Sequence, residues 1–378
     1  MIKRILFNEI KKKIGAKKSI ILFGARQTGK TTLLKELFSG KDDVLWLNGD
    51  DLDTHTIFET TSATRLKASF ANYKFIIVDE AQRIENIGLK FKLITDQMPD
   101  LQLIATGSSA FELANKINEP LTGRKFEFKI FPISFEEMVN QHGFIEENRL
   151  LPHRLVFGYY PEVITSAGKE KEMLKLISDS YLYKDILQWD KIKKSDKLLK
   201  LLQALAYQLG SEVSYNELSK TIGLDNQTIE KYIQLLEQVY IIFRLPSFNR
   251  NHRKELTKSR KIYFYDNGIR NALIADFRIL EMRTDIGALW ENFLISERLK
   301  LINYNNIWTK TYFWRTQNQQ EIDYIEEMDG TLYAYEFKWN ASKNPKLPKT
   351  FSRTYPNHEF KVISPDNYEE FVMNIKGE

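Results

Sequence analysis

Short apolar runs alternate with helically spaced apolar residues over the first 150 positions. The runs predict buried strands at residues 19–23, 44–47, 75–78 and 101–105. Residues 30–38 and 89–97 instead repeat apolar side chains with the period of a helix. Strands that alternate with helices are typical of a parallel sheet with helices on both faces. We therefore predict a doubly wound α/β domain over residues 1–150.

Helical spacing dominates the middle of the chain. Residues 171–208 carry an apolar helical face, and we expect a helical lid or linker over residues 151–210. Gly223 separates two shorter predicted helices, and a pair of apolar stretches follows; these segments are 214–222, 226–240, 239–243 and 262–265. Two helices around a glycine turn, followed by a hairpin, are typical of a winged helix. We predict this fold over residues 211–265.

The last hundred residues combine one helix with period-two alternation. An amphipathic helix is predicted at 286–301, and strands are predicted at 312–315, 321–325 and 332–339. A turn at Asp329-Gly330 separates the last two strands. We therefore predict a small α/β domain over residues 266–378.

The composition of the 378 residues is that of a folded chain with two or three domains. Hydrophobic residues make up 43% and charged residues 28%, as in ordinary globular proteins. Cysteine is absent, which excludes disulfides, thiolate metal sites and a cysteine nucleophile. No apolar run approaches the roughly 18 residues that span a bilayer, and the first residues lack a signal-peptide core. We expect a cytoplasmic protein with no membrane partner.

The net charge of +5 is distributed unevenly along the chain. Residues 1–150 carry a net +2, residues 151–280 carry +6, and residues 281–378 carry −3. Residues 244–261 hold seven lysines and arginines against one acid. Such a segment suits phosphate contacts with DNA or RNA, whereas a solvated hairpin used for protein or intramolecular contacts is the open alternative. The predicted nucleic-acid contacts are Arg250, Arg253, Lys254, Lys258 and Arg260.

A phosphate-binding loop is predicted between the first strand and the helix after it. Residues 24–31 have the pattern G-x-x-x-x-G-K-T. Glycines let main-chain N–H groups close around a phosphate, the lysine meets the β- and γ-oxygens, and the threonine hydroxyl ligates Mg²⁺. We expect ATP and Mg²⁺ as ligands, with Lys30 in catalysis and Thr31 on the metal. The predicted ATP-binding residues are Gly24, Ala25, Arg26, Gln27, Thr28, Gly29, Lys30, Thr31 and Thr32.

Polar side chains follow two further predicted strands. Asp79 and Glu80 come directly after the strand at 75–78, and Thr106 and Ser108 follow the strand at 101–105. Ligands bind beyond the carboxyl ends of strands in open α/β sheets. We expect Asp79 to hold Mg²⁺ through water and Glu80 to orient or deprotonate the attacking water. Ser108 or Thr106 is placed to sense the γ-phosphate, and a plain strand cap is the alternative.

These motifs resemble those of AAA+-type ATPases, in a subgroup that joins such a domain to a C-terminal region long catalogued as a domain of unknown function. The resemblance is carried by GARQTGKTTLL at 24–34, FIIVDEAQRI at 75–84, LIATGSSAFEL at 103–113, LTGRKFEFKIFPISFEE at 121–137 and GYYPEV at 158–163. It implies an arginine that stabilises the γ-phosphate in cis or from a neighbouring subunit, and Arg124 is the candidate. Self-association therefore stays open. No second arginine matches the usual lid sensor, which argues against strong ring-type hydrolysis.

Carboxylates and a lysine converge in the predicted C-terminal sheet. Glu336 and Lys338 share one face of their strand, and the preceding hairpin strand can bring Asp323 beside them. Two converging carboxylates can bind Mg²⁺, and a lysine can steady an attacking water, as metal-assisted phosphodiester cleavage requires. This pattern is similar to the PD-(D/E)xK, restriction-endonuclease-like fold. The resemblance implies that Glu291 is the acid of the preceding helix.

Two functional hypotheses remain open on the sequence. The first is a Mg²⁺-dependent ATPase whose nucleotide state controls a winged helix and a nuclease-like domain on nucleic acid, with nuclease activity undecided. The second is a nucleotide-switched scaffold or protein-binding module whose nuclease-like fold is catalytically silent. ATP binding is common to both, and they differ in the role of Asp323, Glu336 and Lys338.

Overall fold

The contacts within the computed structural model divide the chain into two compact units. Unit 1 comprises Met1–Pro132 with Gln238–Tyr240, and unit 2 comprises Ile133–Glu237 with Ile241–Glu378. The structure describes residues 2–59, 62–108, 117, 119–189, 195–249, 260–340, 342 and 345–374. The four-part division predicted from the sequence is finer than these two units, and it stays a prediction.

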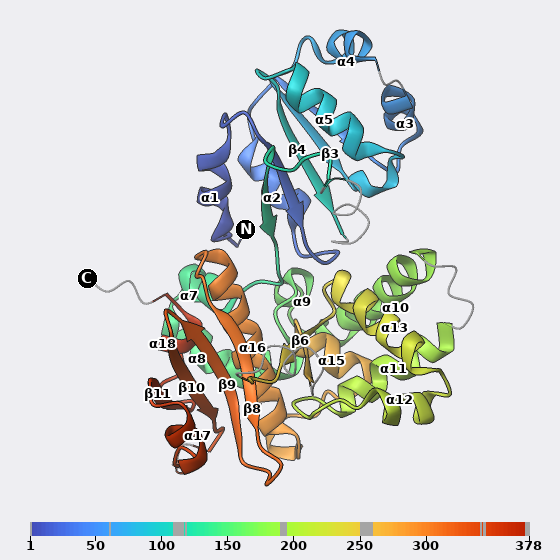
Figure 1. Cartoon of the computed structure of the whole chain (residues 1–378). Helices are drawn as coiled ribbons and strands as arrows, with labels where there is room; N and C mark the ends of the chain where they lie inside the picture. Colours follow the sequence, from blue (N-terminus) through green and yellow to red (C-terminus); the bar gives the residue numbers. More distant parts are fainter. Residues whose placement is uncertain are drawn as a thin grey trace. The chain divides into compact units, whose positions relative to one another are not determined.

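A five-stranded parallel sheet forms the centre of unit 1 (Figure 1). Its order is β2-β3-β4-β1-β5 and every pairing is parallel, which confirms the α/β prediction. The strands are β1 (Ser19–Phe23), β2 (Val44–Asn48), β3 (Phe75–Asp79), β4 (Gln102–Gly107) and β5 (Lys125–Lys129). Sequence reasoning missed β5, because this edge strand alternates charged and aromatic residues and has no continuous apolar run.

The helices of unit 1 pack through the apolar faces that their spacing predicted. The elements are α1 (Leu6–Lys13), α2 (Lys30–Leu37), α3 (Leu52–Glu59), α4 (Ala63–Phe70), the 3-10 turn η1 (Ala81–Arg83) and α5 (Ile87–Gln97). Leu33, Leu34 and Leu37 of α2 are buried. The ring of Phe58 in α3 lies 6.3 Å from that of Phe70 and 6.4 Å from that of Phe91, which joins α3, α4 and α5.

Unit 2 begins with helices. They are α7 (Phe135–His142), α8 (Phe144–Phe157), α9 (Pro161–Thr165), α10 (Glu170–Trp189), α11 (Ser195–Tyr207), α12 (Tyr215–Ile222), α13 (Asn226–Gln238), α15 (Asn267–Leu273), the 3-10 turn η2 (Leu280–Met282) and α16 (Ile286–Tyr304). The Phe135 ring lies 6.2 Å from that of Phe293, and the main-chain N–H of Phe135 donates to Glu297 Oε2 at 2.8 Å. Helix α7 therefore packs against α16. None of the helices in the described ranges is long and apolar enough to cross a membrane.

Helices α12 and α13 lead into an antiparallel hairpin of β6 (Ile242–Pro246) and β7 (Arg260–Phe264). Gly223 ends α12 with a φ of 71°, a left-handed conformation that glycine adopts without steric cost. Ahead of α12, Glu212 forms an antiparallel bridge with Lys261, and the Val213 N–H donates to the carbonyl of Arg260 at 2.9 Å. The predicted order of two helices and a hairpin is therefore present, with one further strand-like contact.

A four-stranded mixed sheet in the order β11-β10-β9-β8 completes unit 2. The strands are β8 (Lys310–Arg315), β9 (Glu321–Met328), β10 (Thr331–Phe337) and β11 (His358–Ile363), and only β10 and β11 pair in parallel within it. Phe351 of α17 (Lys349–Thr354) packs in a buried cluster with Trp314 and Ile325. Phe371 of α18 (Glu369–Val372) contacts the rings of Tyr324, Tyr335 and Phe337. Because β10 ends at Phe337, Lys338 follows the strand and does not lie inside it as predicted.

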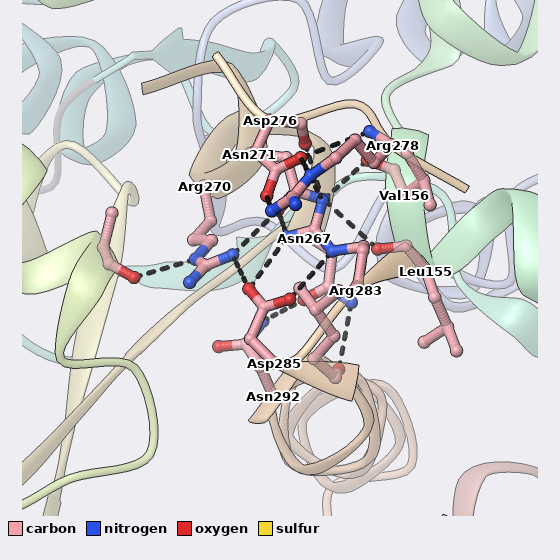
Figure 2. Close-up of polar contacts among 12 residues, drawn as sticks. Leu155, Val156, Asn267, Arg270, Asn271, Asp276, Arg278, Arg283, Asp285 and Asn292 are labelled. Carbon is pink, nitrogen blue, oxygen red and sulfur yellow. Dashed lines mark hydrogen bonds and ion pairs between the residues drawn. The ribbon is translucent and has the colours of Figure 1, made fainter. Parts of the chain in front are cut away.

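A buried polar network ties α15 to the elements around it (Figure 2). Arg270 donates to Asp285 at 2.6 Å, and Arg283 donates to Asp285 at 2.8 Å and to Asn271 at 3.1 Å. Asn271 in turn donates to the carbonyl of Val156 at 2.8 Å, at the end of α8. Burial alone would raise the pKa of Asp285, but hydrogen bonds from the two arginines hold it below its ordinary value. Charges buried this deeply must be paired, so the network determines how these helices meet.

Replacing Arg283 by methionine should lower the free energy of unfolding by about 3 kcal/mol, because Asp285 loses one of its two arginine partners and the buried Asn271 loses a donor. Arg278→Met is the matched control, since the Arg278 side chain is 58% exposed whereas that of Arg283 is fully buried. We expect the control to unfold at nearly the wild-type urea concentration. Urea unfolding followed by tryptophan fluorescence measures both. Equal destabilisation by the two substitutions would contradict the importance of the buried network.

Candidate nucleotide site and C-terminal carboxylate cluster

The predicted phosphate loop connects β1 to α2 through two glycines with positive φ. Gly24 has a φ of 154°, and a Cβ atom there would lie 2.0 Å from the carbonyl oxygen of Ile130. Gly29, with a φ of 91°, is the N-cap of α2, so main-chain N–H groups at the start of this helix open onto the loop. Lys30 Nζ donates to the carbonyls of Gly24 at 2.9 Å and Ala25 at 2.7 Å. The loop therefore presents a lysine and a helix N-terminus, the groups that bind phosphate.

Arg4 supports this loop from behind, which sequence reasoning did not predict. Its guanidinium donates to the carbonyl of Thr28 at 2.6 Å and to that of Phe131 at 2.7 Å. Arg4 is only 7% exposed. Because both acceptors are main-chain atoms far from Arg4 in sequence, no motif marks the contact. The arginine fixes the loop to the end of the segment that follows β5.

Three strand ends bring Thr31, Asp79 and Thr106 together. Thr31 Oγ1 donates to Asp79 Oδ2 at 2.7 Å, and Thr106 Oγ1 donates to Asp79 Oδ1. The Glu80 N–H donates to Thr106 Oγ1 at 3.2 Å. The hydroxyl of Thr31 and the carboxylate of Asp79 are oxygen ligands of the kind that Mg²⁺ takes, and they already lie in contact. These residues therefore fit a metal ion beside a bound phosphate, as the sequence predicted for Thr31 and Asp79.

Glu80 lies at the same edge of the sheet, in contact with Ser108. Ser108 Oγ donates to Glu80 Oε2 at 3.2 Å, and Gln82 Nε2 donates to that oxygen at 2.5 Å and to Ser108 Oγ at 3.1 Å. Glu80 itself has a φ of 50°, a left-handed conformation that is rare outside glycine. The structure thus places the predicted acid and the predicted sensor side by side. Gln82, which connects them, was not predicted.

Arg124 lies at the opposite edge of the sheet. Its carbonyl accepts from the Ser19 N–H at 2.9 Å, at the start of β1, whereas the phosphate loop follows the other end of that strand. Five strand residues separate these ends by roughly 16 Å. The Arg124 side chain pairs with Asp96, with Nε 2.5 Å from Oδ1. The prediction that Arg124 reaches the γ-phosphate of its own chain is therefore wrong, and only a contact with a neighbouring subunit's nucleotide stays open.

In unit 2, four acids and two lysines gather where β7, α16, β9 and β10 meet. We call them the carboxylate cluster, and its members are Lys261, Glu291, Glu321, Asp323, Glu336 and Lys338. The structure therefore brings together all four residues predicted for a nuclease-like site. It adds Glu321 and Lys261, which the sequence had not assigned there.

Lys261 is the central cation of the carboxylate cluster. Its Nζ lies 3.0 Å from Glu291 Oε1 and 2.5 Å from Glu321 Oε1, and the side chain is almost fully buried. The Tyr263 hydroxyl also donates to Glu291 Oε1, at 2.5 Å. Burial alone would lower the pKa of Lys261, but the charges of Glu291 and Glu321 raise it above its ordinary value. The two carboxylates thus stabilise the ammonium form of the lysine. Lys261 is one of the seven basic residues counted in residues 244–261, and its charge is paired within unit 2.

The two remaining acids of the cluster, Asp323 and Glu336, also accept hydrogen bonds. Burial and the charge of Glu291 raise the pKa of Asp323 to about 7, although the Phe337 N–H donates to its Oδ2 at 2.8 Å. Glu336 Oε1 accepts from Lys338 Nζ at 2.7 Å. Burial and the neighbouring Asp323 raise the pKa of Glu336. Burial, with repulsion between neighbouring acids added to it, therefore disfavours the charged forms of Asp323 and Glu336.

These residues do not fit the divalent metal that a nuclease-like site requires. Over the ranges that the structure describes, no group of three or more Asp, Glu or His side chains is arranged to hold a metal ion. Between the acids of α16 and β9 lies the ammonium group of Lys261. The arrangement of the described side chains therefore gives no support to a Mg²⁺ site at these carboxylates, and that site stays a prediction.

The predicted nucleic-acid contacts fall largely outside the described residues. Arg250, Arg253, Lys254 and Lys258 lie there, and only Arg260 can be placed. The guanidinium of Arg260 stacks 4.6 Å from the ring centroid of Tyr215 and donates to its hydroxyl at 2.9 Å. Arg244, in the same basic segment, pairs with Glu237 at 2.5 Å. Both arginines thus have partners within unit 2.

Three family models match successive parts of the chain. Residues 16–139 match a model described as an AAA domain, and residues 148–279 and 286–373 match models described as domains of unknown function, DUF8612 and DUF4143. Unit 1 therefore contains an AAA-type ATPase domain, and the chain ends in a DUF4143 region. The match to the AAA domain includes the loop, the acid pair and the strand end with Ser108.

The chain also resembles curated proteins and a solved structure. An uncharacterized protein of Methanocaldococcus jannaschii is 24% identical over 98% of this chain and 89% of its own length. One of Mycobacterium tuberculosis is 26% identical over 84% of this chain and 70% of its own length. A Walker-type ATPase of Pyrococcus abyssi has a TM-score of 0.50 at 14% identity, covering 72% of this chain and 96% of that chain. This last likeness supports the P-loop α/β fold.

Arg4→Met should weaken nucleotide binding about 10-fold although Arg4 does not belong to the loop, because two charged hydrogen bonds that fix the loop are lost. Lys3→Met is the matched control, since the neighbouring Lys3 is exposed. Titration with a fluorescent ATP analogue measures the affinity of both. An affinity of Arg4→Met equal to that of Lys3→Met would show that the arginine does not position the loop.

Proposed function

We propose that this protein is an ATP-binding, Mg²⁺-dependent ATPase whose nucleotide state controls a second unit that contacts nucleic acid. The observation that carries the proposal is the 2.7 Å hydrogen bond from Thr31 to Asp79, beside the ammonium group of Lys30. A hydroxyl, a carboxylate and a lysine at a glycine loop are the groups that bind a metal-bound triphosphate. The match of residues 16–139 to an AAA domain supports ATP as the nucleotide.

Each residue at this edge of the sheet has a role in the proposed hydrolysis. Lys30 would exchange its two carbonyl acceptors for phosphate oxygens. Thr31 and Asp79 would hold Mg²⁺, which neutralises phosphate charge when bound. Glu80 Oε2, oriented by Gln82, would accept a proton from the attacking water or align it, and Ser108 would sense the γ-phosphate.

We also propose that residues 211–265 act as a winged helix. The order α12, α13, β6 and β7, with the bridge between Glu212 and Lys261 as a third short strand, supports this interpretation. Asn226 and Gln227 are exposed at the start of α13. They line an open depression together with Asn216, Ser219, Lys220 and Asp225. Amide side chains at this position suit hydrogen bonding to base edges.

The phosphate contacts of this winged helix are proposed to come from the basic residues between β6 and β7 in the sequence. Arg244 and Lys261 are paired with acids of unit 2, and Arg260 contacts Tyr215 and lies 4.0 Å from Glu230, so all three have partners there. Arg250, Arg253, Lys254 and Lys258 are the basic residues left in the segment. DNA and RNA are both compatible with contacts of this kind.

The second candidate function is a nucleotide-switched scaffold or protein-binding module. One observation favours a silent C-terminal region within it: the Lys261 ammonium pairs with Glu291, the predicted helix acid of the nuclease-like site, and with Glu321. Self-association belongs to either candidate, and an Arg124 that acts on a neighbouring subunit's nucleotide would require it. Gel filtration with and without a nonhydrolysable ATP analogue distinguishes a nucleotide-dependent oligomer from a monomer.

Lys30→Ala should weaken ATP binding about 10- to 100-fold, because a charged partner of the phosphates is removed. Glu80→Gln should keep the affinity and lower the hydrolysis rate by about 100-fold, because its oxygen no longer accepts a proton. Lys35→Ala is the control, since Lys35 is exposed on the same helix as Lys30. Equilibrium binding and phosphate release measure the two effects. Unchanged nucleotide affinity in Lys30→Ala would refute the loop assignment.

Reversing the charges of Arg253 and Lys254 to glutamate should weaken DNA or RNA binding and flatten its dependence on salt, because fewer counterions are released. The control reverses Lys11 and Lys12, two exposed lysines of α1 outside the proposed surface. Fluorescence anisotropy of a labelled oligonucleotide at several salt concentrations measures the slope. Identical slopes for the two double variants would count against a nucleic-acid contact at the hairpin.

A further inference from the structure

The carboxylate cluster already contains its own cation. Lys261 Nζ lies within hydrogen-bond distance of Glu291 Oε1 and Glu321 Oε1, from two different elements. Glu291 is the helix acid that the nuclease-like pattern implies, and Asp323 is two residues beyond Glu321 on β9. The ammonium group therefore pairs with the helix acid and with Glu321, and its charge also acts on Asp323, one of the two acids predicted to hold Mg²⁺.

The strand that carries Lys261 holds this ammonium group in place. Lys261 pairs with Leu245 in the hairpin register and with Glu212 on its other side, so β7 is hydrogen-bonded along both edges. The chain beyond β6 adds a main-chain contact to the C-terminal sheet, since the Phe248 N–H donates to the carbonyl of Phe313 at 2.7 Å. Lys261 Nζ also lies 5.5 Å from the centre of the Phe313 ring. Moving the lysine out of the cluster would require the paired strands to separate. A surface lysine, in contrast, could move away by a change of side-chain rotamer.

At least one oxygen of each acid in the carboxylate cluster is paired with an internal donor, and for Asp323 this donor is the Phe337 N–H on Oδ2. Glu291 Oε1 accepts from both Lys261 and the Tyr263 hydroxyl. Glu321 is shared between Lys261 and Arg315, whose Nε lies 3.7 Å from its Oε2. Glu336 accepts from Lys338. A divalent ion at 2.0 to 2.6 Å from these oxygens, about the range for Mg²⁺ and Ca²⁺, would displace the donors and lie against a fixed positive charge.

We propose that the Lys261 ammonium replaces the divalent metal ion of the C-terminal carboxylate cluster, so that this site binds no metal and does not cleave nucleic acid. The cluster acts instead as an ion-paired joint between β7 of the hairpin and the C-terminal sheet. Removing one amine would expose acids already gathered for metal binding. The inference is independent of ATP hydrolysis in unit 1, because all its residues lie in unit 2.

The test compares Mn²⁺ binding in protein whose lysine is intact with that in the Lys261→Met variant. All proteins carry Asp79→Asn and contain no nucleotide, so that the phosphate loop contributes no metal ligand from that residue. The loss of the free Mn²⁺ electron paramagnetic resonance signal reports binding. We expect Lys261→Met to gain one Mn²⁺ and to bind it at least about 10-fold more tightly than the parent, because a fixed charge is removed from beside the ion. The melting temperature of Lys261→Met should rise when Mn²⁺ is added.

Two further variants make the gain specific. Lys261→Arg keeps a cation and should bind no more Mn²⁺ than the parent. Adding Glu291→Gln to Lys261→Met should abolish the gained site. The proposal is overturned if a folded Lys261→Met gains no Mn²⁺, or if Glu291→Gln alone removes Mn²⁺ from the parent.

A second measurement on the otherwise wild-type chain does not depend on the folding of Lys261→Met. Labelled DNA and RNA are incubated with wild-type protein, and separately with the Glu336→Gln variant, in Mn²⁺ or Mg²⁺. We expect the two proteins to leave the same amount of intact substrate. Cleavage by the wild type that Glu336→Gln abolishes would overturn the proposal while leaving ATP hydrolysis in unit 1 unaffected.

Discussion

The carboxylate of Asp79 is the group on which the nucleotide half of the molecule depends. It ends β3, and its two oxygens accept hydrogen bonds from Thr31 after β1 and from Thr106 in β4. Because β4 lies between β1 and β3, this one side chain reaches across three neighbouring strands. The sheet order therefore gathers three distant pieces of sequence at one edge. The glycine loop, the acid Glu80 and the supporting Arg4 are all arranged around that meeting point.

What could be predicted from the sequence was what a strand end or a periodic pattern marks locally. Asp79 and Glu80 lie at the end of an apolar strand, and Lys30 and Thr31 follow another one after the glycine loop, so the topology of a parallel sheet was enough to bring them together. Strand β5 lacked a continuous apolar run and escaped prediction. Arg4 and Gln82 escaped for another reason. Their partners are main-chain carbonyls or side chains that come near only in the folded chain. Such contacts produce no characteristic spacing of residues in the sequence.

The charge available in residues 244–261 was overestimated from the sequence for a similar reason. A count over residues 244–261 treats every lysine and arginine as free to meet a phosphate. In the folded chain Arg244 pairs with Glu237, and Lys261 pairs with Glu291 and Glu321. Those acids come from other helices and strands, so a sequence window counts the cation and omits its partner. The excess charge of the segment is therefore concentrated on fewer residues than the sum suggests.

The ion pairs of Lys261 constrain how the two C-terminal regions can be recombined in evolution. The lysine belongs to residues 148–279, which match one domain of unknown function, whereas Glu291, Glu321 and Asp323 belong to residues 286–373, which match another. The ion pairs of Lys261 therefore connect two regions that two different family models describe. A recombination event that kept the later region and exchanged the earlier one would leave its acids without their cation. In related chains, the residue at the position of Lys261 would then distinguish proteins whose acids bind a metal ion from proteins whose acids form internal ion pairs.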